Sequence, residues 1–451
     1  MARNNGAALA TTGREIVKAR HSNGDSNKIR PEDRPAHEWS RFVLSYPPHL
    51  VRDYLERFGV VSGQVVLDPF SGTGTTPVEC KKQGVESIGV EANPMSFFAS
   101  SVKLDWSPDP DGLIEHARHV ADRALRHLRL EGIEDHPALI DANVRKNGKL
   151  KLRTLDEERL KLLLTNSVSP LPLHKALVLM DAIEGERDER FYRHERLAFA
   201  KSLVANSSNL HFGPEVGVSP PKPDAPVVMP WLKTVEAMAA DLRTLRPLNR
   251  TPARVYHADA RNFGAYIDDR VDAVITSPPY PNEKDYTRTT RLEAVLLGFA
   301  STMADVRAYK RNSVRSNTRG VYKDDTDDQW IDGHPEVERI AREIEERRIE
   351  LGKTSGFEKL YARVTKLYFG GMKRHLAELR TVLRPGAQLA YVVGDQASYL
   401  RVMIRTGHLL ADIAEELGYE VTSIDLFRTR LATATKEQLR EEVVVLRWPG
   451  R

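Results

Sequence analysis

The most constraining feature of this sequence is a continuous pattern of strand, glycine turn, helix and strand between residues 64 and 93. The β-branched run 64-QVVLD-68 is typical of a buried strand. The turn 68-DPFSGTGTT-76 leads into helical text, and 86-ESIGVEAN-93 indicates a second buried strand. Parallel strands joined by a helix open a doubly wound α/β sheet, in which ligands bind beyond the carboxyl ends of the strands. The sequence therefore predicts a ligand site at the glycine turn.

Later parts of the chain supply the remaining strands of such a sheet. Strand patterns resume at 254-RVYHADA-260 and 271-VDAVITSPPY-280, and another follows at 387-AQLAYVVGD-395. After one more helix, the chain closes with strands at 420–429 and 441–448. Two terminal strands after the last helix fit an antiparallel hairpin. We therefore expect an α/β fold with a seven-stranded Rossmann-like sheet and a large, mainly helical insertion.

Two segments lack the sheet pattern and are expected to be insertions. The first contains amphipathic helices at 112–130, 155–167 and 231–245, and the second contains a basic loop at 310–323 and a charged helix at 336–351. The predicted organisation is a flexible basic arm (1–34), a catalytic domain (35–100 and 251–451), a mainly helical insertion (101–250) and a charged secondary insertion (300–355).

Composition excludes several classes of protein. Lys and Arg total 67 against 63 Asp and Glu, and this net charge of +4 suits a nucleic-acid partner without requiring one. The only cysteine, Cys80, cannot form a disulfide or a cysteine-based zinc site within one chain, and we expect no metal. Apolar runs are too short to span a membrane, and the first 30 residues have no apolar core of a secretory signal. We therefore expect a cytoplasmic protein.

The first candidate site combines the glycine turn with a carboxylate. Gly72 and Gly74 allow a tight turn and close approach of a ligand, and Thr75 begins the next helix. Glu91 ends the following strand, where its carboxylate can accept both hydroxyls of a ribose. The turn lacks the lysine of a phosphate-binding loop and the spacing of dinucleotide enzymes. It therefore favours a nucleoside ligand without phosphates.

The second candidate site is 276-TSPPY-280, at the end of a predicted strand. Pro278 and Pro279 fix the backbone and donate no N–H, so the carbonyls of Ser277 and Pro278 are available as acceptors. Ser277 adds a hydroxyl oxygen, and Tyr280 offers a flat face for stacking. This arrangement suits a flipped-out base whose amino group must be held and polarised.

Together these motifs resemble those of the S-adenosylmethionine-dependent DNA methyltransferases that modify exocyclic amino groups, at cytosine N4 or adenine N6. DPFSGTGTT is similar to their cofactor motif and TSPPY to their catalytic motif; 45-SYPPHLV-51, 394-GDQ-396 and 440-REEVVVLRW-448 extend the likeness. The resemblance implies a class I methyltransferase sheet and S-adenosylmethionine as cofactor. The residues implied to bind it are Ser45, Tyr46, Pro47, Asp68, Pro69, Phe70, Gly72, Gly74, Thr75, Thr76, Glu91, Ala92, Asn93, Asp259 and Ala260, with Glu91 on the ribose and Asp259 on the adenine amino group.

The catalytic motif predicts direct transfer to an amine. Ser277 Oγ and the Pro278 carbonyl would accept hydrogen bonds from both amino N–H groups and localise the nitrogen lone pair for in-line attack. Carbon-5 methylation of cytosine needs a cysteine after a proline, and Cys80 lies on the cofactor-side helix, which excludes that class. Serine at the first motif position favours cytosine N4 over adenine N6. The alternatives are an RNA amino-methyltransferase and a non-catalytic nucleic-acid-binding subunit.

The expected partner is double-stranded DNA, with any restriction or defence subunit a separate chain. Residues 101–250 are a candidate target-recognition region, although a lid or a dimer surface is also consistent with helices there. The basic loop is expected either to grip backbone phosphates or to be a solvated surface. Its candidate phosphate contacts are Lys310, Arg311, Arg315, Arg319 and Lys323.

Overall fold

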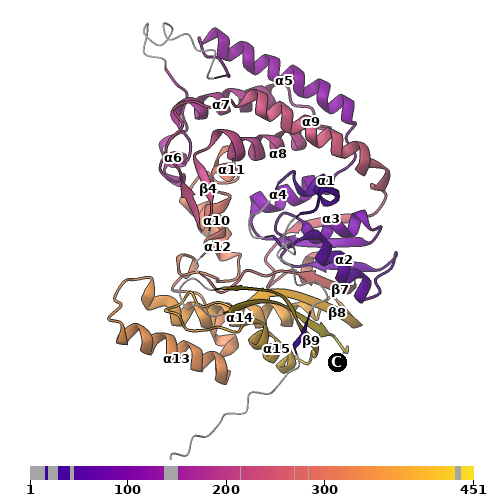
Figure 1. Cartoon of the computed structure of the whole chain (residues 1–451), viewed down its shortest axis with the longest axis vertical. Coiled ribbons are helices and arrows are strands. Elements are labelled where there is room, and N and C mark those ends of the chain that lie inside the picture. The colour runs from indigo at the N-terminus through magenta and orange to yellow at the C-terminus, as the bar shows by residue number, and fades with distance from the viewer. Residues whose placement is uncertain are drawn as a thin grey trace, which may run out of the picture.

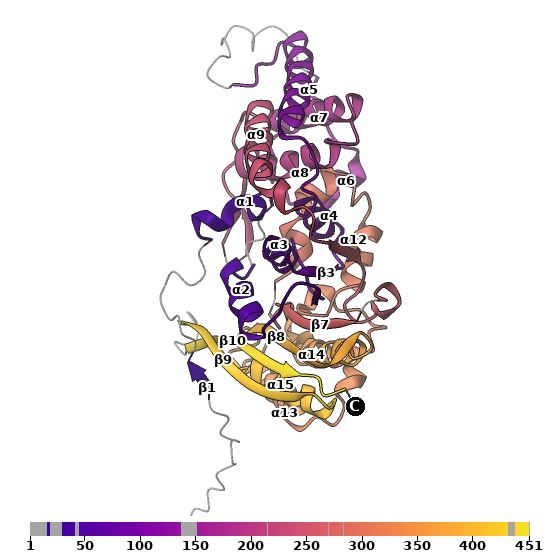
Figure 2. The ribbon, with the colours of Figure 1, turned by 90° about the vertical axis from the view of Figure 1, so that its right-hand side faces the viewer.

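The computed structural model describes residues 16–18, 29–40, 45–136, 151–213, 215–268, 270–282, 284–431 and 438–450. Their centre is a mixed sheet that runs through the molecule (Figures 1 and 2). Its strand order is β1-β9-β10-β8-β7-β2-β3-β6. In chain order the strands are β1 (Ile16–Lys18), β2 (Val65–Asp68), β3 (Glu86–Glu91), β6 (Ala253–His257), β7 (Val271–Thr276), β8 (Leu383–Gly394), β9 (Glu420–Leu431) and β10 (Gln438–Arg447).

The direction of the strands confirms the predicted seven-stranded sheet. Neighbouring strands from β6 to β8 are parallel, and β10 pairs antiparallel with both β8 and β9. The closing hairpin expected from the sequence is therefore present. The three-residue strand β1 adds an eighth, parallel strand at the edge beside β9, which the sequence did not indicate.

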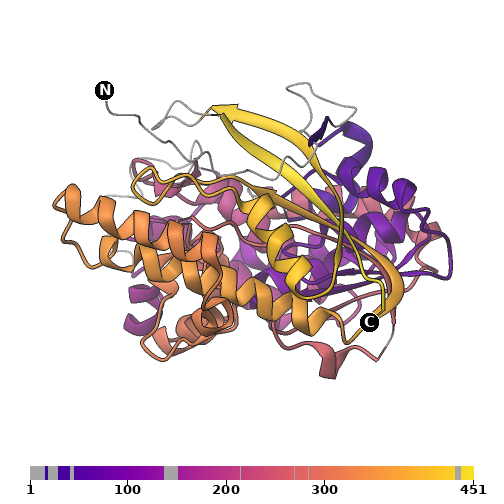
Figure 3. The same ribbon diagram turned by 90° about the horizontal axis from the view of Figure 1, so that it is seen from below.

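Helices cover both faces of the sheet because adjacent residues of its buried strands point to opposite sides. Leu67 packs with α13, α14 and α15, whereas its neighbour Val66 packs with α2 and α3. Figure 3 shows the three helices of the first face, orange and yellow, lying across the sheet. The helices of the two faces are α2 (Pro48–Arg57), α3 (Thr75–Lys82), α4 (Pro94–Lys103), α13 (Pro335–Glu350), α14 (Tyr361–Leu379) and α15 (Thr406–Glu416).

Between β3 and β6 the chain forms the helical region at the top of Figure 1. Its elements are α5 (Pro110–Leu130), α6 (Glu157–Leu162), α7 (Pro170–Gly185), α8 (Tyr192–Ser202), the π-helical turn η4 (Leu203–Ser207), the hairpin β4 (Leu210–Phe212) and β5 (Val216–Val218), α9 (Val228–Leu245) and η5 (Arg246–Leu248). The helix predicted over 155–167 is shorter, because the backbone at Leu163 is extended and ends α6. The hairpin lies within 206–226, a segment rich in Pro, Gly and Asn.

The remaining described elements lie before β2, between β6 and β7, and between β7 and β8. They are η1 (Pro31–Asp33), α1 (Arg34–His37), η6 (Gly264–Tyr266), α10 (Tyr286–Thr289), α11 (Arg291–Leu296), α12 (Met303–Arg311), η7 (Thr318–Gly320), η8 (Asp327–Ile331) and η9 (Glu358–Leu360). Within the described ranges, no helix is long and apolar enough to cross a membrane.

The predicted boundary of the N-terminal arm at residue 34 is wrong for the residues just before it. Asp33 is 2% exposed, and its carboxylate lies 2.8 Å from Arg52 Nη1. Arg52 also contacts Glu79 of α3, which accepts a 2.7 Å hydrogen bond from His37 Nε2. The folded part therefore begins before residue 34, because buried charges pair with this segment. Residues 1–15 and 19–28 of the predicted arm lie outside the described residues.

Candidate active site

One cavity of about 720 Å³ lies beyond the carboxyl ends of the parallel strands. Its wall contains residues that directly follow β2, β3, β6, β7 and β8, so five strands contribute to one site. Both sequence motifs reach it. A volume of this size is ordinary for a small-molecule or cofactor site.

The two glycines of the turn have different roles. Both adopt positive φ, +52° at Gly72 and +87° at Gly74, which favours glycine. A Cβ at Gly72 would meet no atom within 4 Å, so the turn is open there. A Cβ at Gly74 would lie 2.5 Å from Ser100 Oγ of α4. Gly72 therefore leaves room for a ligand, whereas Gly74 allows two helices to pack.

Glu91 is held in the cavity wall by backbone groups on both sides. Its two carboxylate oxygens accept N–H groups from Gly72 and Asn93, each at 2.7 Å. Burial raises the pKa of the Glu91 carboxyl to about 7, although these hydrogen bonds oppose the shift. Each oxygen keeps a further lone pair. The carboxylate can therefore accept hydroxyl groups, as recognition of a ribose requires.

Asp68 lies behind this wall and ties the turn to the neighbouring strand. It is fully buried, and it accepts hydrogen bonds from Thr276 Oγ1 at 2.6 Å, Tyr46 Oη at 3.0 Å and the Phe70 N–H at 3.1 Å. Burial raises the pKa of its carboxyl to about 6. Asp68 therefore shapes the site through its neighbours.

The predicted cofactor-binding residues fall into two groups: those that line the cavity and those that do not. Those in the wall are Ser45, Tyr46, Pro69, Phe70, Gly72, Thr75, Glu91, Ala92, Asn93, Asp259 and Ala260. Pro47, Asp68, Gly74 and Thr76 are not in the wall. We therefore expect no direct contact between these four residues and a ligand in the cavity.

His375 supports the side of the cavity formed by Ala260 and Phe70. Its Nδ1–H donates to the Ala260 carbonyl and its Nε2 accepts from Tyr391 Oη, both at 2.7 Å. Burial lowers the pKa of His375 to about 4, so the ring is neutral at physiological pH. The Phe70 ring packs edge-on against it, with centroids 4.7 Å apart. This wall is therefore rigid and largely apolar, as a purine ring requires.

The catalytic motif forms the wall at the end of β7. Ser277 Oγ donates to the Val392 carbonyl at 3.0 Å, so its hydrogen is engaged and its lone pairs are available as acceptors. The Tyr280 ring lies against Gly394, where a Cβ would be 2.9 Å from the ring. Pro278, Pro279 and Tyr280 line the same cavity as Glu91. The two predicted sites are thus parts of one cavity.

The closing hairpin adds residues that sequence reasoning missed. Phe427, Arg428, Leu439 and Glu441 also line the cavity. Arg428 binds Glu441 with both Nε and Nη2. Glu441 pairs across the sheet with Gly394 on one side and Arg428 on the other. The available signal was a charged residue in each of the two closing strands, Arg428 and Glu441.

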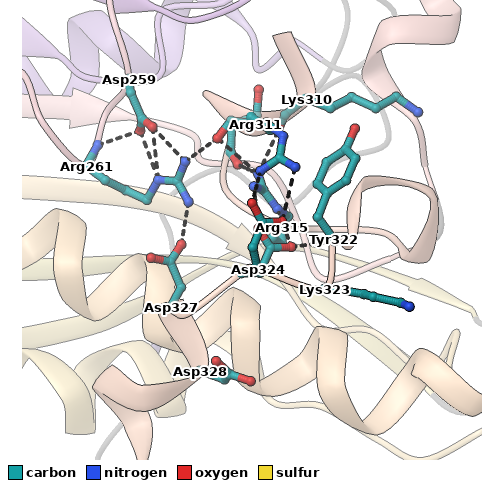
Figure 4. A network of polar contacts seen from close by, with 12 residues as sticks. Asp259, Arg261, Lys310, Arg311, Arg315, Tyr322, Lys323, Asp324, Asp327 and Asp328 are labelled. Atoms are coloured by element: carbon teal, nitrogen blue, oxygen red, sulfur yellow. Dashed lines mark hydrogen bonds and ion pairs between the residues drawn. The ribbon is translucent and has the colours of Figure 1, made fainter. Parts of the chain in front are cut away.

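The basic loop is not a loop of free cations. Arg315 is 4% exposed, and its guanidinium binds Asp325 at 2.7 Å and the carbonyls of Lys310, Arg311 and Ser313 (Figure 4). Its predicted contact with a backbone phosphate is wrong, because the guanidinium is buried and already bound within the protein. Lys310 is paired with Asp285 at 2.6 Å.

The other three predicted phosphate contacts are exposed. Arg311 is ion-paired with Asp324, which is itself exposed, and Arg319 and Lys323 also lie at the surface. Two of the five predicted cations, Lys310 and Arg315, instead line the cavity. Among the residues that the structure describes, no group of three or more His, Cys, Asp or Glu is placed to hold a metal ion.

The seven-stranded sheet, with both sequence motifs lining one cavity beyond the carboxyl ends of its parallel strands, has the architecture of a class I methyltransferase. A family model described as DNA methylase, for N6 and N4 methyltransferases, matches residues 16–97. The Type II methyltransferase M.BsoBI of Geobacillus stearothermophilus is 25% identical over 91% of this chain and 84% of its own length. M.AvaI of Nostoc sp. is 24% identical over 93% of this chain and 87% of its own. These similarities support the family of amino-methylating DNA methyltransferases, whose cofactor is S-adenosylmethionine.

Among solved structures, TrmN from Thermus thermophilus aligns with 93% of the chain and 54% of its own at 10% identity, with a TM-score of only 0.31. The cofactor fits the residues present: a carboxylate at Glu91 for the ribose hydroxyls, open space at Gly72, a second carboxylate at Asp259 and the rigid apolar wall at Phe70.

Proposed function

We propose that this chain methylates the N4 amino group of a cytosine flipped out of double-stranded DNA. One observation carries the proposal: Ser277, with its hydrogen donated to Val392, faces the cavity that Glu91 also lines. An acceptor for an amine and a carboxylate for a nucleoside therefore share one cavity. A base in the duplex cannot reach such a cavity, which is why flipping is required.

Different residues of the cavity bind the cofactor and the target base. S-adenosylmethionine supplies a methyl group activated by a sulfonium. Glu91 holds the ribose, and Asp259 accepts from the adenine amino group. Ser277 Oγ and the Pro278 carbonyl accept hydrogen bonds from the two amino N–H groups of the target, which localises the nitrogen lone pair towards the methyl group. Tyr280 stacks on the target ring, so that catalysis is mainly positioning.

Two features support cytosine over adenine. Ser277 stands at the first position of the catalytic motif, where Asp or Asn is common in adenine enzymes. Arg428, a hydrogen-bond donor, also lines the cavity and is held there by Glu441. Cytosine carries two acceptors, N3 and O2, on the edge next to its amino group, whereas adenine carries N1 followed by C2–H. A donor at this position therefore complements cytosine better.

We propose that the DNA-binding surface lies beside the cavity. Arg311, Arg319 and Lys323 are exposed near the cavity-lining stretch 312–317 and are suited to backbone phosphates. The helical region between β3 and β6 is proposed to read the target sequence, because the loop of its β4–β5 hairpin places Glu215 in the cavity wall. A restriction enzyme acting with this methyltransferase would be a separate chain.

The deciding experiment is single-turnover transfer of labelled methyl to duplex DNA, followed by digestion to nucleosides and mass analysis. Label on cytosine N4 is the expected result. Label on adenine N6 would keep the mechanism and reverse the base. Label on RNA alone, or at carbon 5 of cytosine, would refute the proposal, as would cofactor binding without transfer to any nucleic acid.

A further inference from the structure

Arg261 joins two parts of the site that lie far apart in the sequence (Figure 4). It is 6% exposed, and its Nε and Nη2 donate to the Asp259 carboxylate at 3.0 and 2.6 Å. Nη1 donates to Asp327 of η8, and Nη2 also donates to the Arg311 carbonyl at 2.7 Å. Its backbone N–H donates to Asp259 as well, at 2.8 Å. The guanidinium is thus held on three sides by partners in three segments.

The partners on the far side of Arg261 are fixed by close packing. A Cβ at Gly370 of α14 would lie 1.8 Å from the Asp327 carbonyl oxygen, so η8 contacts the backbone of α14 directly. Asp327 Oδ1 also lies 3.3 Å from Arg374 of the same helix. Because η8 cannot shift relative to α14, the position of Asp327 is set by the sheet core. Arg261 therefore connects Asp259 to a rigid support.

Asp259 depends on that support for its orientation. Its side chain is 21% exposed and lines the cavity, whereas Arg261 binds it from behind. A planar guanidinium that contacts both carboxylate oxygens fixes the plane of the carboxylate. Without Arg261, Asp259 would lose three hydrogen bonds to the guanidinium, and no cation would stand between it and Asp327.

We propose that Arg261 is a positioning residue that selects the base of the cofactor: by fixing the Asp259 carboxylate, it makes the site require an amino group at carbon 6 of the purine. A fixed acceptor discriminates strongly against a carbonyl oxygen at that position, because two acceptors then face each other. A rotatable carboxylate turns away and discriminates weakly. The proposal rests on the placement of the cofactor adenine at Asp259.

The test compares two ligands in the absence of DNA: S-adenosylhomocysteine and its counterpart with hypoxanthine in place of adenine. Their calorimetric affinities are measured for the unaltered protein, Arg261→Gln, Asp259→Asn and the double variant. We expect the unaltered protein to prefer the adenine ligand by about 100-fold. Arg261→Gln should reduce this preference at least fivefold, and adding it to Asp259→Asn should cause no further loss. Arg261→Lys, which keeps the charge but not the planar fork, should recover only part of it.

Arg374→Gln is the matched control, because Arg374 contacts Asp327 but has no contact with Asp259 in the described structure. Its preference should stay within twofold of the unaltered protein. A folded Arg261→Gln protein with undiminished preference would overturn the proposal, and so would an equal loss of affinity for both ligands, which a purely structural role predicts. An unchanged preference in Asp259→Asn would instead show that adenine does not lie there. Neither result depends on which DNA base is methylated.

Discussion

Burial raises the pKa of two carboxylates in this site, with different consequences. Asp68 faces donors from Thr276 and Tyr46 and lies outside the cavity wall, so its charge organises the fold locally. Glu91 has only backbone donors and faces the cavity. A bound nucleoside is therefore expected to change the ionisation of Glu91 and not that of Asp68.

Cofactor affinity should accordingly decrease as the pH falls through about 7, the pKa of the Glu91 carboxyl. Only the ionised carboxylate accepts from both ribose hydroxyls, so the protonated form binds less tightly and ligand binding should lower this pKa. Calorimetry from about pH 5.5 to 8.5 tests this. Glu91→Gln should weaken binding about tenfold or more at pH 8 and remove the pH dependence. An affinity that is constant over this range in the unaltered protein would contradict the assignment.

Ser277→Ala should slow methyl transfer roughly ten- to hundredfold with little change in cofactor affinity, because it removes an acceptor that matters most as the amine becomes pyramidal. Tyr280→Ala should instead weaken DNA binding by about 1–3 kcal/mol through lost stacking. Single-turnover rates and DNA titrations separate the two effects. Full activity in the double variant would mean that the amine does not bind at this motif.

The residues that could be placed from the sequence are those whose geometry is set by their immediate neighbours in the chain. Gly72, Glu91 and Ser277 stand in short motifs whose geometry is local, so their place at strand ends could be anticipated. Arg428 could not be assigned, because its partner Glu441 is brought to it by strand pairing. Arg315 was misassigned for a similar reason: the acidic partner that buries it lies ten residues on, in a segment without regular periodicity.

Among the elements, α3 shows how a buried charge can hold a segment that composition describes as mobile. Glu79 of α3 is fully buried beside His37 and Arg52. Burial alone raises the pKa of Glu79, but the hydrogen bond from His37 and the charges of Lys82 and Arg52 outweigh it and lower the pKa to about 2. Asp33 joins this network through Arg52 of α2, and the basic, polar composition of residues 1–34 gave no indication of that partner.

Glu79→Ala should therefore destabilise the protein by about 3 kcal/mol at neutral pH, because it leaves buried donors unpaired. The contribution of Glu79 is present above its ordinary pKa and should be lost as the pH falls from about 4.5 towards 2. Urea denaturation measures both effects. Glu56→Ala, on the exposed side of α2, is the control and should change stability by less than about 0.5 kcal/mol. Equal effects of the two substitutions would contradict the role of Glu79.

The exposed cations around η7 offer a second prediction for an element. Neutralising Arg319 and Lys323 together should reduce the slope of log affinity against log salt by roughly two units, because two phosphate contacts are lost. Arg384 and Arg447, exposed at the opposite end of the sheet, provide the control pair and should leave the slope unchanged. If the two double variants behave alike, this surface does not contact DNA.

For the whole molecule, the helical region is continuous with the sheet domain. One hydrophobic cluster contains Trp39, Val78 of α3 and Met95 of α4 together with α5, α7, α8 and α9. Trp39 Nε1 also donates to Asp241 of α9 at 2.7 Å. The sequence predicted the helices of this region but not this continuity, because amphipathic periodicity shows which face is buried and not what covers it.

A shared core predicts that the helical region and the cofactor cavity unfold together. Trp231 of α9 is fully buried and donates to the Glu195 carbonyl at 3.0 Å. Trp231→Ala should cost about 3–5 kcal/mol through the cavity it leaves, while the folded protein keeps its cofactor affinity. Denaturation followed by far-ultraviolet circular dichroism and by cofactor binding should give one coincident transition in both proteins. Two separate transitions, with cofactor binding surviving the first, would show instead that the helical region is an independent domain and that its packing against α3 and α4 contributes little.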